Sequence, residues 1–149
     1  MVRRVQSEHP TRLPRLKHPP GSDLGIVKYT NASIPKPGVI ARYDGTVQDI
    51  TYARDPNRGE FVCKAGSTTG YTCGRVTNPS TTVTYWDGTT VYSVIETNVC
   101  SKNGDSGGPL HSGPAALGIL SGGSDCGTGQ VTYFERVTEF QAGRGIYVY

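Results

Sequence analysis

The sequence predicts a single all-β domain, a sandwich or barrel built from many short strands. Its 149 residues fit one domain. Gly accounts for 20 residues, Thr for 17 and Tyr for 9; Thr and Tyr favour strands, and Gly supplies turns. From residue 47 onward, short β-branched and aromatic runs alternate with turn signals. This composition excludes a coiled coil or a helical bundle, and no run of 18 apolar residues is present that could span a membrane.

The expected elements follow in chain order. GIVKYT (25–30) predicts a strand, and residues 31–38 are typical of a connector. Runs bounded by Gly, Pro, Asn or Asp predict further strands at 47–52, 60–65, 71–77, 81–86, 90–97, 108–112, 115–121, 130–134 and 145–149. Asp87-Gly88 is the strongest hairpin signal. A helix of one or two turns is expected at 135–142, where Val137 and Phe140 lie three apart, and Gly143 would end it.

Residues 1–21 are predicted to form a basic, Pro-rich, unstructured arm. Residues 1–20 hold five basic side chains and one acidic side chain, a charge of +4, whereas the rest holds 10 basic and 11 acidic side chains, a charge of −1. A nucleic-acid-binding arm stays as an alternative that would require salt-sensitive binding. Because basic and aromatic residues are not interleaved on the folded part, no nucleic-acid partner is expected. MVRRVQSEHP also lacks the apolar core of a secretory signal peptide.

Four cysteines, at 63, 73, 100 and 126, indicate the redox setting. The absence of a C-x-x-C pair argues against a zinc ribbon or a thioredoxin-like motif. An even number of cysteines in a Gly- and Thr-rich β chain predicts two disulfides and an exported protein, in conflict with the N-terminus. No metal or other cofactor is expected, because calcium-loop spacing is missing from Asp44, Asp49, Asp55 and Glu60.

The segment GDSGGPL, Gly104 to Leu110, is the sharpest chemical signal. A Ser hydroxyl becomes a nucleophile only with a base, a partner that orients the base, and donors for the developing oxyanion. Gly on both sides of Ser106 lets successive N–H groups converge on one point, and the N–H groups of Gly104 and Ser106 are the candidate donors. A Gly-rich turn with an incidental Ser is the alternative.

GDSGGPL resembles the nucleophile segment of chymotrypsin-like serine endopeptidases. VCKAGSTTGYTCG (62–74), NVCSKNGDSGGPL (98–110), ALGILSGGS (116–124) and GIYVY (145–149) are similar to the streptogrisin and alpha-lytic protease branch, and SDLGIVKYT (22–30) resembles its catalytic-Asp segment. The resemblance implies that 39–149 form the second Greek-key β-barrel of the trypsin-like fold, with a short C-terminal helix. Residues 22–38 would be the last strand of the first barrel and a connector.

The resemblance also implies a role for individual residues. Ser106 would be the nucleophile, and Asp23 the carboxylate that orients the catalytic imidazole. Gly104 and Ser106 would supply the oxyanion hole. The strand that pairs with the substrate backbone would comprise Ser121, Gly122 and Gly123.

The catalytic His of the family has no counterpart in this sequence. The family carries it before the Asp, in a segment like TAGHC, whereas His9 lies in SEHPT and His18 in LKHPP. His111 follows the nucleophile, which is the wrong side in chain order. The chain is therefore expected to lack most of the first barrel and to be incomplete or inactive as it stands. A non-catalytic peptide-binding module derived from a protease is the alternative.

Three further expectations rest on the resemblance. The disulfides would be Cys63–Cys73 and Cys100–Cys126. Lys64 would pair with Asp105 beneath the nucleophile loop, because a buried carboxylate needs a cation or several N–H donors. A preference for large apolar side chains is expected, since residues 97–100 contain no acid and Leu120 stands where glutamate-specific relatives carry a His. The expected partner is a polypeptide substrate, the expected state a monomer, and the expected location extracellular.

Overall fold

The structure is a computed structural model that describes residue 25, residues 30–142 and residues 147–148. The predicted arm, Asp23, His9 and His18 lie outside the described residues, as does most of the predicted strand at 25–30. Of the strand predicted at 145–149, only Tyr147 and Val148 are described, and neither lies in a strand.

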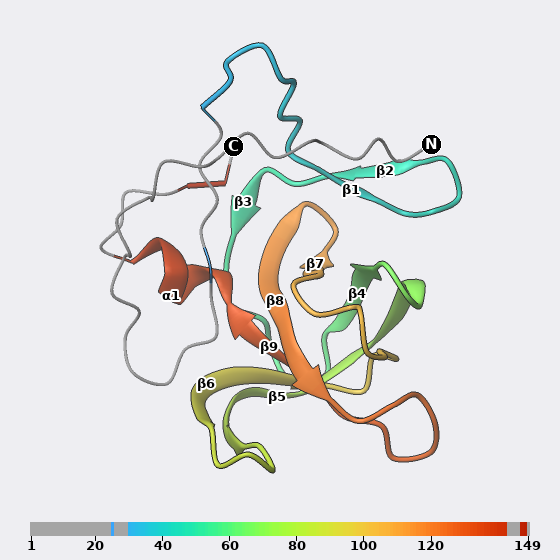
Figure 1. Cartoon of the computed structure of the whole chain (residues 1–149), viewed down its shortest axis with the longest axis vertical. Helices are drawn as coiled ribbons and strands as arrows, with labels where there is room; N and C mark the ends of the chain where they lie inside the picture. The colour runs from blue at the N-terminus through green and yellow to red at the C-terminus, as the bar shows by residue number, and fades with distance from the viewer. Residues whose placement is uncertain (1–24, 26–29, 143–146, 149) are drawn as a thin grey trace.

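Antiparallel strands close into a β-barrel (Figure 1). The pairing of β8 with β9 joins the two ends of the order β8-β7-β4-β5-β6-β9, so that each of these strands has a neighbour on both sides. The strands are β4 (Phe61–Gly66), β5 (Gly70–Thr84), β6 (Thr90–Thr97), β7 (Pro109–Ser112), β8 (Ala115–Gly123) and β9 (Thr132–Arg136). The predicted all-β barrel of the trypsin-like type is confirmed.

The connection between β6 and β7 makes the barrel a Greek key. β4, β5 and β6 follow one another as hairpins, and β7 then returns to lie beside β4, giving the spatial order β7-β4-β5-β6. Residues 98–108 form this crossover, and they include GDSGG. The fold itself therefore lifts the nucleophile segment out of the barrel wall at one end.

A small hairpin lies across the opposite end of β7 and β4. β1 (Val39–Ala41) pairs with β2 (Val47–Asp49), and β3 (Tyr52–Ala53) then runs parallel to the first residues of β8 (Figure 1). β1 is not among the predicted strands, because three residues carry no periodicity that a sequence pattern can reveal.

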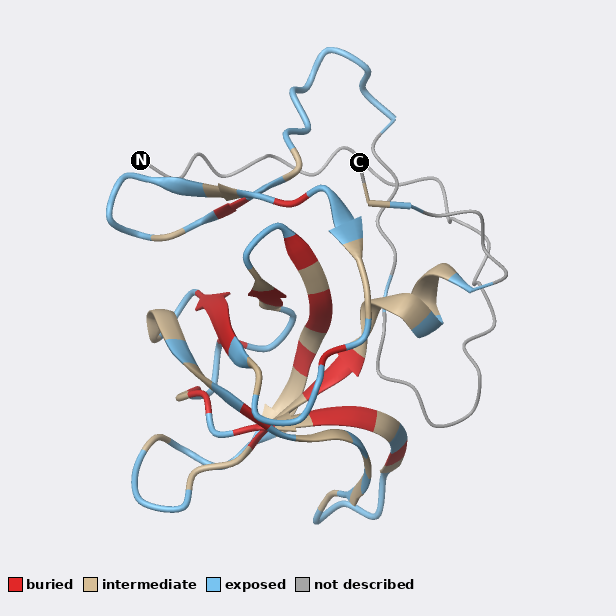
Figure 2. Cartoon of the chain, turned by 180° about the vertical axis from the view of Figure 1, so that it is seen from behind, coloured by how far each residue is buried: buried red, intermediate tan, exposed pale blue. Residues whose placement is uncertain are grey.

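Apolar side chains from opposite walls fill the barrel. Figure 2 shows the buried residues concentrated on β4, β8 and β9. The main core comprises Val62, Val76, Ile95, Val99, Leu110, Ala115, Leu117, Leu120 and Phe134. A second cluster of Ile40, Ile50 and Ala65 holds the β1–β2 hairpin against the barrel.

The predicted strands at 71–77 and 81–86 are wrong as separate elements. They form the continuous β5, which pairs with β6 through three register shifts between Val76 and Val83. Asn78-Pro79-Ser80 is typical of a turn, but bulges accommodate Pro79 and keep the strand running. The hairpin at Asp87-Gly88 is confirmed, and Tyr85 N–H donates to Thr89 O across it (2.8 Å).

The short helix is confirmed as α1 (Val137–Gln141). None of its residues is buried, and it is tied to the preceding loop by Thr138, whose hydroxyl donates to Asp55 (2.6 Å). Across the described ranges, no helix combines the length and the apolar content that crossing a membrane requires.

Candidate active site

The nucleophile loop is fixed at both of its ends by backbone hydrogen bonds. Asp105 N–H donates to Lys102 O (3.0 Å) and Gly108 N–H to Asp105 O (2.9 Å), which closes two successive turns around Ser106. Gly107 N–H and Gly108 O then bond to the carbonyl and the N–H of Leu120 on β8, both at 2.9 Å. Ser106 is exposed at the top of this double turn.

Two N–H groups of this loop stay available for a ligand. Within the described part of the chain, neither Gly104 N–H nor Ser106 N–H donates to a protein acceptor. Gly104 has φ +99°, a conformation that L side chains rarely adopt, and a Cβ there would lie 2.3 Å from the Thr68 hydroxyl oxygen. Only Gly fits this position, which is the one the resemblance assigns to an oxyanion-hole donor.

Asp105 points away from Ser106 into the protein and is 1% exposed. Its Oδ1 accepts from the N–H groups of Thr68 (2.8 Å) and Thr69 (3.0 Å), and its Oδ2 from the Thr69 hydroxyl (2.6 Å) and Lys102 N–H (3.1 Å). Burial by itself would raise the pKa of Asp105, but the hydrogen bonds from Thr69 and its neighbours outweigh it and hold that pKa below its ordinary value.

The predicted Lys64–Asp105 ion pair is present. Lys64 Nζ lies 3.3 Å from Asp105 Oδ2, and both side chains are fully buried. The Thr69 hydroxyl joins the two, because it donates to the carboxylate and accepts from Lys64 at 2.6 Å. Burial lowers the pKa of Lys64, and the Asp105 charge opposes that shift.

The turn between β4 and β5 carries the nucleophile loop, and sequence reasoning missed this role. The hydroxyls of Ser67 and Thr68 donate to the carbonyls of Gly104 and Asn103. Gly66 allows the close approach, since a Cβ there would lie 2.3 Å from Asp105 Oδ1. The signal was local: Ser-Thr-Thr-Gly is a turn sequence whose first three residues all carry hydroxyl donors.

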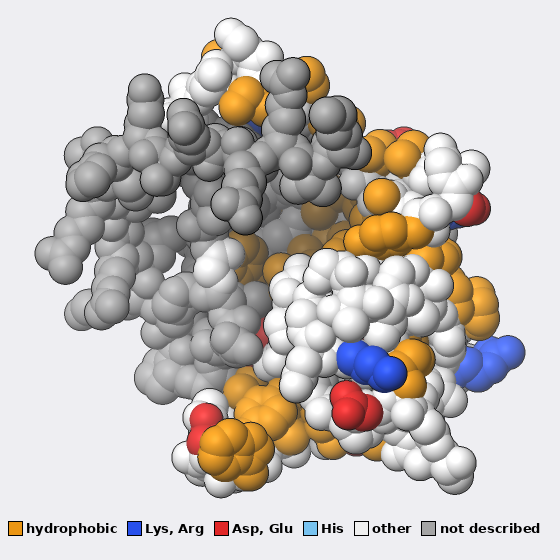
Figure 3. All heavy atoms as spheres, turned by 45° about the vertical axis from the view of Figure 1, so that its right-hand side comes forward, with side chains coloured by type: hydrophobic (Ala, Val, Ile, Leu, Met, Phe, Trp, Pro, Cys, Tyr) orange, Lys and Arg blue, Asp and Glu red, His pale blue; other side chains and the backbone are white. Residues whose placement is uncertain are grey.

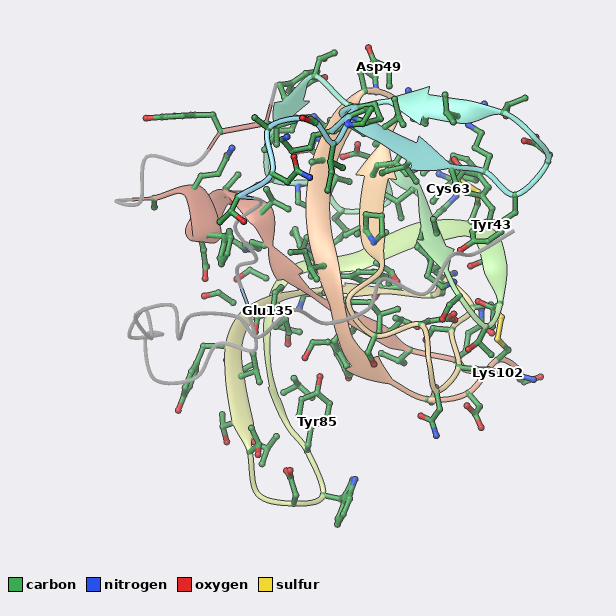
Figure 4. The ribbon with its side chains drawn as sticks, turned by 45° about the horizontal axis from the view of Figure 1, so that its top comes forward. Tyr43, Asp49, Cys63, Tyr85, Lys102 and Glu135 are labelled. Carbon is green, nitrogen blue, oxygen red and sulfur yellow. A yellow bond between two sulfur atoms is a disulfide. The ribbon has the colours of Figure 1, made fainter. Side chains whose placement is uncertain are left out.

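The strand assigned to the substrate backbone lies beside this loop. β7 pairs with β8 only as far as Ile119, and β9 occupies the other edge of β8. Among the described strands, none therefore lies beside Gly122 and Gly123 on the edge that faces Ser106. The Tyr85 hydroxyl lies 3.0 Å from Ser121 Oγ, and a Cβ on Gly122 would lie 2.8 Å from the Tyr85 ring. In Figure 4 the Tyr85 side chain lies on the side of the β5–β6 hairpin that faces the end of β8.

Two hollows flank Ser106. The smaller, of about 40 Å³, lies between the nucleophile loop and the end of β8 and is lined by Ser101, Lys102, Asn103, Ser106, Leu120, Gly122, Gly123, Ser124 and Asp125. The larger, of about 370 Å³, lies between the loop and the β1–β2 hairpin, with Val39, Ile40, Ala41 and Tyr43 on its far wall. A polypeptide placed along β8 would thus have space on both sides of Ser106.

Both predicted disulfides are present. Cys63–Cys73 joins β4 to β5 across a directly paired position. Cys100–Cys126 joins the start of the crossover to the loop after β8, so it connects the two walls of the smaller hollow.

His111 is not placed to act as a base. It is buried on β7, and both ring nitrogens have partners: Nε2 lies 2.8 Å from the Tyr71 hydroxyl and Nδ1 3.0 Å from Gly113 O. No described residue forms a hydrogen bond with the Ser106 hydroxyl. In the same ranges, no three His, Cys, Asp or Glu side chains are grouped to hold a metal ion.

The Greek-key barrel, the double turn at Ser106 and the buried Asp105 define a trypsin-like serine endopeptidase barrel. The sequence matches the Trypsin family over residues 3–142, and the chain belongs to that family. The match begins inside the segment that the sequence analysis interpreted as an arm.

Individual relatives narrow the branch. Streptogrisin-A of Streptomyces griseus is 45% identical over 121 residues, which are 80% of this chain and 40% of that protein. Glutamyl endopeptidase 2 of the same organism is 44% identical over 131 residues, 87% of this chain and 69% of the relative. A glutamic acid specific serine protease has a similar structure, with a TM-score of 0.76, 43% identity, and coverage of 82% of this chain and 65% of that one.

The resemblance to the streptogrisin and alpha-lytic protease branch is thereby confirmed. The chain spans less than half the length of Streptogrisin-A and 32% of Streptogrisin-D.

Proposed function

We propose that the protein is a serine endopeptidase that cleaves polypeptides through an acyl-enzyme on Ser106. The observation that carries the proposal is the arrangement around Asp105. Its carboxylate takes five contacts beneath the loop, and the N–H groups of Gly104 and Ser106 on the opposite side have no acceptor among the described residues. Such preorganised donors stabilise the charge that develops in acyl transfer.

The proposed reaction has two steps. Ser106 Oγ attacks the scissile carbonyl carbon, its proton passes to an imidazole, and the oxyanion is held by the N–H groups of Gly104 and Ser106. The C–N bond then breaks as the imidazole protonates the departing amine. Water attacks the resulting ester in the same way, which releases the acid and restores the Ser106 hydroxyl.

The imidazole and its partner are the parts that the described residues do not contain. We assign the orienting role to Asp23, on the resemblance alone. For the 149-residue chain by itself we expect hydrolysis far below the usual turnover of about 1–10³ s⁻¹. Catalysis by the oxyanion hole alone leaves roughly 10³–10⁴ over the uncatalysed rate.

The preference for large apolar side chains remains our proposal for the residue before the scissile bond. Leu120 lies at the base of the smaller hollow, and Gly122 and Gly123 leave its wall without side chains. Its volume of about 40 Å³ requires the walls to part when such a side chain enters. A glutamate preference is the second candidate, because Ser101, Lys102 and Ser124 also line the hollow and two relatives are named for that specificity.

A serine-directed phosphonate tests whether Ser106 is activated. Mass spectrometry of the folded chain should show one added phosphonyl group, located at Ser106. The Ser106→Ala variant and the chain unfolded in guanidinium are the controls, and neither should be labelled. Equal labelling of the folded and the unfolded chain would contradict the proposal, because the reactivity would then owe nothing to the fold.

The same experiment separates the enzyme from the peptide-binding module. A module would bind peptides along β8 yet leave Ser106 unlabelled. The two disulfides support an extracellular location, since such bonds persist in oxidising compartments.

A further inference from the structure

One large aromatic side chain of the barrel has no burial at all. Trp86, in the turn between β5 and β6, is 99% exposed. In Figure 3, hydrophobic side chains reach the surface at the bottom of the view, where this hairpin lies. A single exposed aromatic needs no explanation by itself, so the argument depends on where the turn holds it.

The turn that carries Trp86 is rigid. Gly88 N–H donates to Tyr85 O (2.9 Å), Asp87 Oδ1 accepts from Thr89 N–H (2.9 Å), and Gly88 takes φ +84°. The hydrogen bonds from Thr89 hold the pKa of Asp87 below its ordinary value, so this bond persists at neutral pH. The backbone on both sides of Trp86 is therefore fixed before any ligand arrives.

The turn is also attached to the substrate strand. Tyr85, the residue before Trp86, packs its ring over Gly122 and places its hydroxyl 3.0 Å from Ser121 Oγ. Consecutive Cα atoms lie about 3.8 Å apart, so the Trp86 backbone starts one residue from this contact. A peptide paired with β8 would pass Ser121 and Gly122 and then reach the exposed indole.

We propose that Trp86 determines specificity by contacting a side chain of the bound polypeptide at the third or fourth residue before the scissile bond, with a preference for apolar and aromatic residues there. The inference rests on the proposed function, because it takes Ser106 and the edge of β8 as the peptide-binding frame. Trp on a rigid backbone is the residue that most often dominates a binding surface, since it buries a large area and loses little conformational entropy.

Peptide boronic acids test this, because the boron accepts the Ser106 Oγ lone pair and fixes the register of the peptide. Two probes share the same three residues next to boron and differ at the fourth, which is Phe or Gly; a second pair varies the third residue. In the unmodified chain the Phe probe of at least one pair should bind about tenfold more tightly. In Trp86→Ala the ratio should fall to about one, and in Trp86→Phe it should be largely restored.

Trp86 is the only Trp in the sequence, so it reports its own environment. Binding of the Phe probe should shift indole emission to shorter wavelength and reduce quenching by acrylamide, whereas the Gly probe should do neither. Tyr92→Ala is the matched control: Tyr92 is 57% exposed on β6 and should leave the ratio unchanged.

The outcomes separate the two proposals. Tight binding of all probes, with no dependence on the third or fourth residue and no change in emission, would overturn the role of Trp86 and leave the proposed function standing. Failure of every probe to bind Ser106 would overturn both. Equal loss of the ratio in Trp86→Ala and Tyr92→Ala would also count against the assignment, because the effect would then come from the hairpin as a whole.

Discussion

Replacing Asp105 by Asn should destabilise the barrel in a way that depends on pH. The substitution leaves the Lys64 ammonium buried, with only the Thr69 hydroxyl at 2.6 Å and the Gly70 carbonyl at 3.4 Å. Breaking a buried ion pair from one side typically costs about 3–5 kcal/mol. For a chain of this size, 3 kcal/mol corresponds to a fall in Tm of roughly 6–12 °C.

The reverse substitution should cost less. Lys64→Met removes one contact from Asp105 but leaves the four hydrogen-bond donors at 2.6–3.1 Å. About 2 kcal/mol is expected, the lower part of the range for losing one charged partner. The double variant should be more stable than the sum of the single effects predicts, because neither charge is then stranded.

The pH dependence gives the sign. Without Asp105, burial lowers the pKa of Lys64 further below that of the unfolded chain, so the unfolded state binds the proton more tightly. Stability then rises with pH between the lowered pKa and the ordinary value of about 10.4. Thermal unfolding followed by circular dichroism should show a smaller deficit for Asp105→Asn at pH 9 than at pH 6. A deficit under about 1 kcal/mol, or one that does not change with pH, would refute the reasoning.

Three further outcomes are expected. Gly66→Ala should cost several kcal/mol, of the order of other buried overpacking changes, because its Cβ would lie 2.3 Å from Asp105 Oδ1. Burial lowers the pKa of His111, so wild-type stability should fall as pH drops below about 6.5, and His111→Gln should fall less between pH 7 and pH 5. Replacing Cys100 and Cys126, 26 residues apart, by Ala should lower the free energy of unfolding by about 3.5 kcal/mol in a chain-entropy estimate.

Each of these has a control within the chain. Gly25→Ala should be nearly neutral, since nothing lies within 4 Å of the added Cβ; a cost equal to that at Gly66 would point to backbone entropy instead of a clash. Identical pH profiles for wild type and His111→Gln would assign the acid loss to other groups. The Cys63–Cys73 pair closes only 10 residues and should contribute about 2.7 kcal/mol by the same estimate; a larger loss there than at Cys100–Cys126 would contradict the loop-length argument.

The parts of the site that sequence reasoning predicted are those carried by short contiguous motifs. GDSGG placed Ser106 and Gly104 on one tight loop, and the resemblance placed Lys64 beneath Asp105. The hydroxyl donors of Ser67, Thr68 and Thr69 were missed, because they reach residues 35 to 37 positions away and no local pattern encodes such a contact.

The errors in the fold have the same origin. Asn78-Pro79-Ser80 is locally a turn, and only its pairing with β6 across several bulges makes it a strand. β1 exists because it pairs with β2 and because Ile40 packs on Ala65, neither of which follows from its three residues. The strand contents of β4, β6 and β8 were predictable because their patterns are long enough to define one buried face.

The turn between β4 and β5 has a consequence for how this sequence can drift. Ser67 and Thr68 are exposed and contact no part of the small hollow beside Ser106, so a survey of surface positions would class them as freely replaceable. Their hydroxyls nevertheless hold the carbonyls of Gly104 and Asn103. In a library of all single substitutions selected for function, these two surface positions should accept few residues, with Ser and Thr interchangeable, whereas neighbouring exposed positions such as Phe61 accept many.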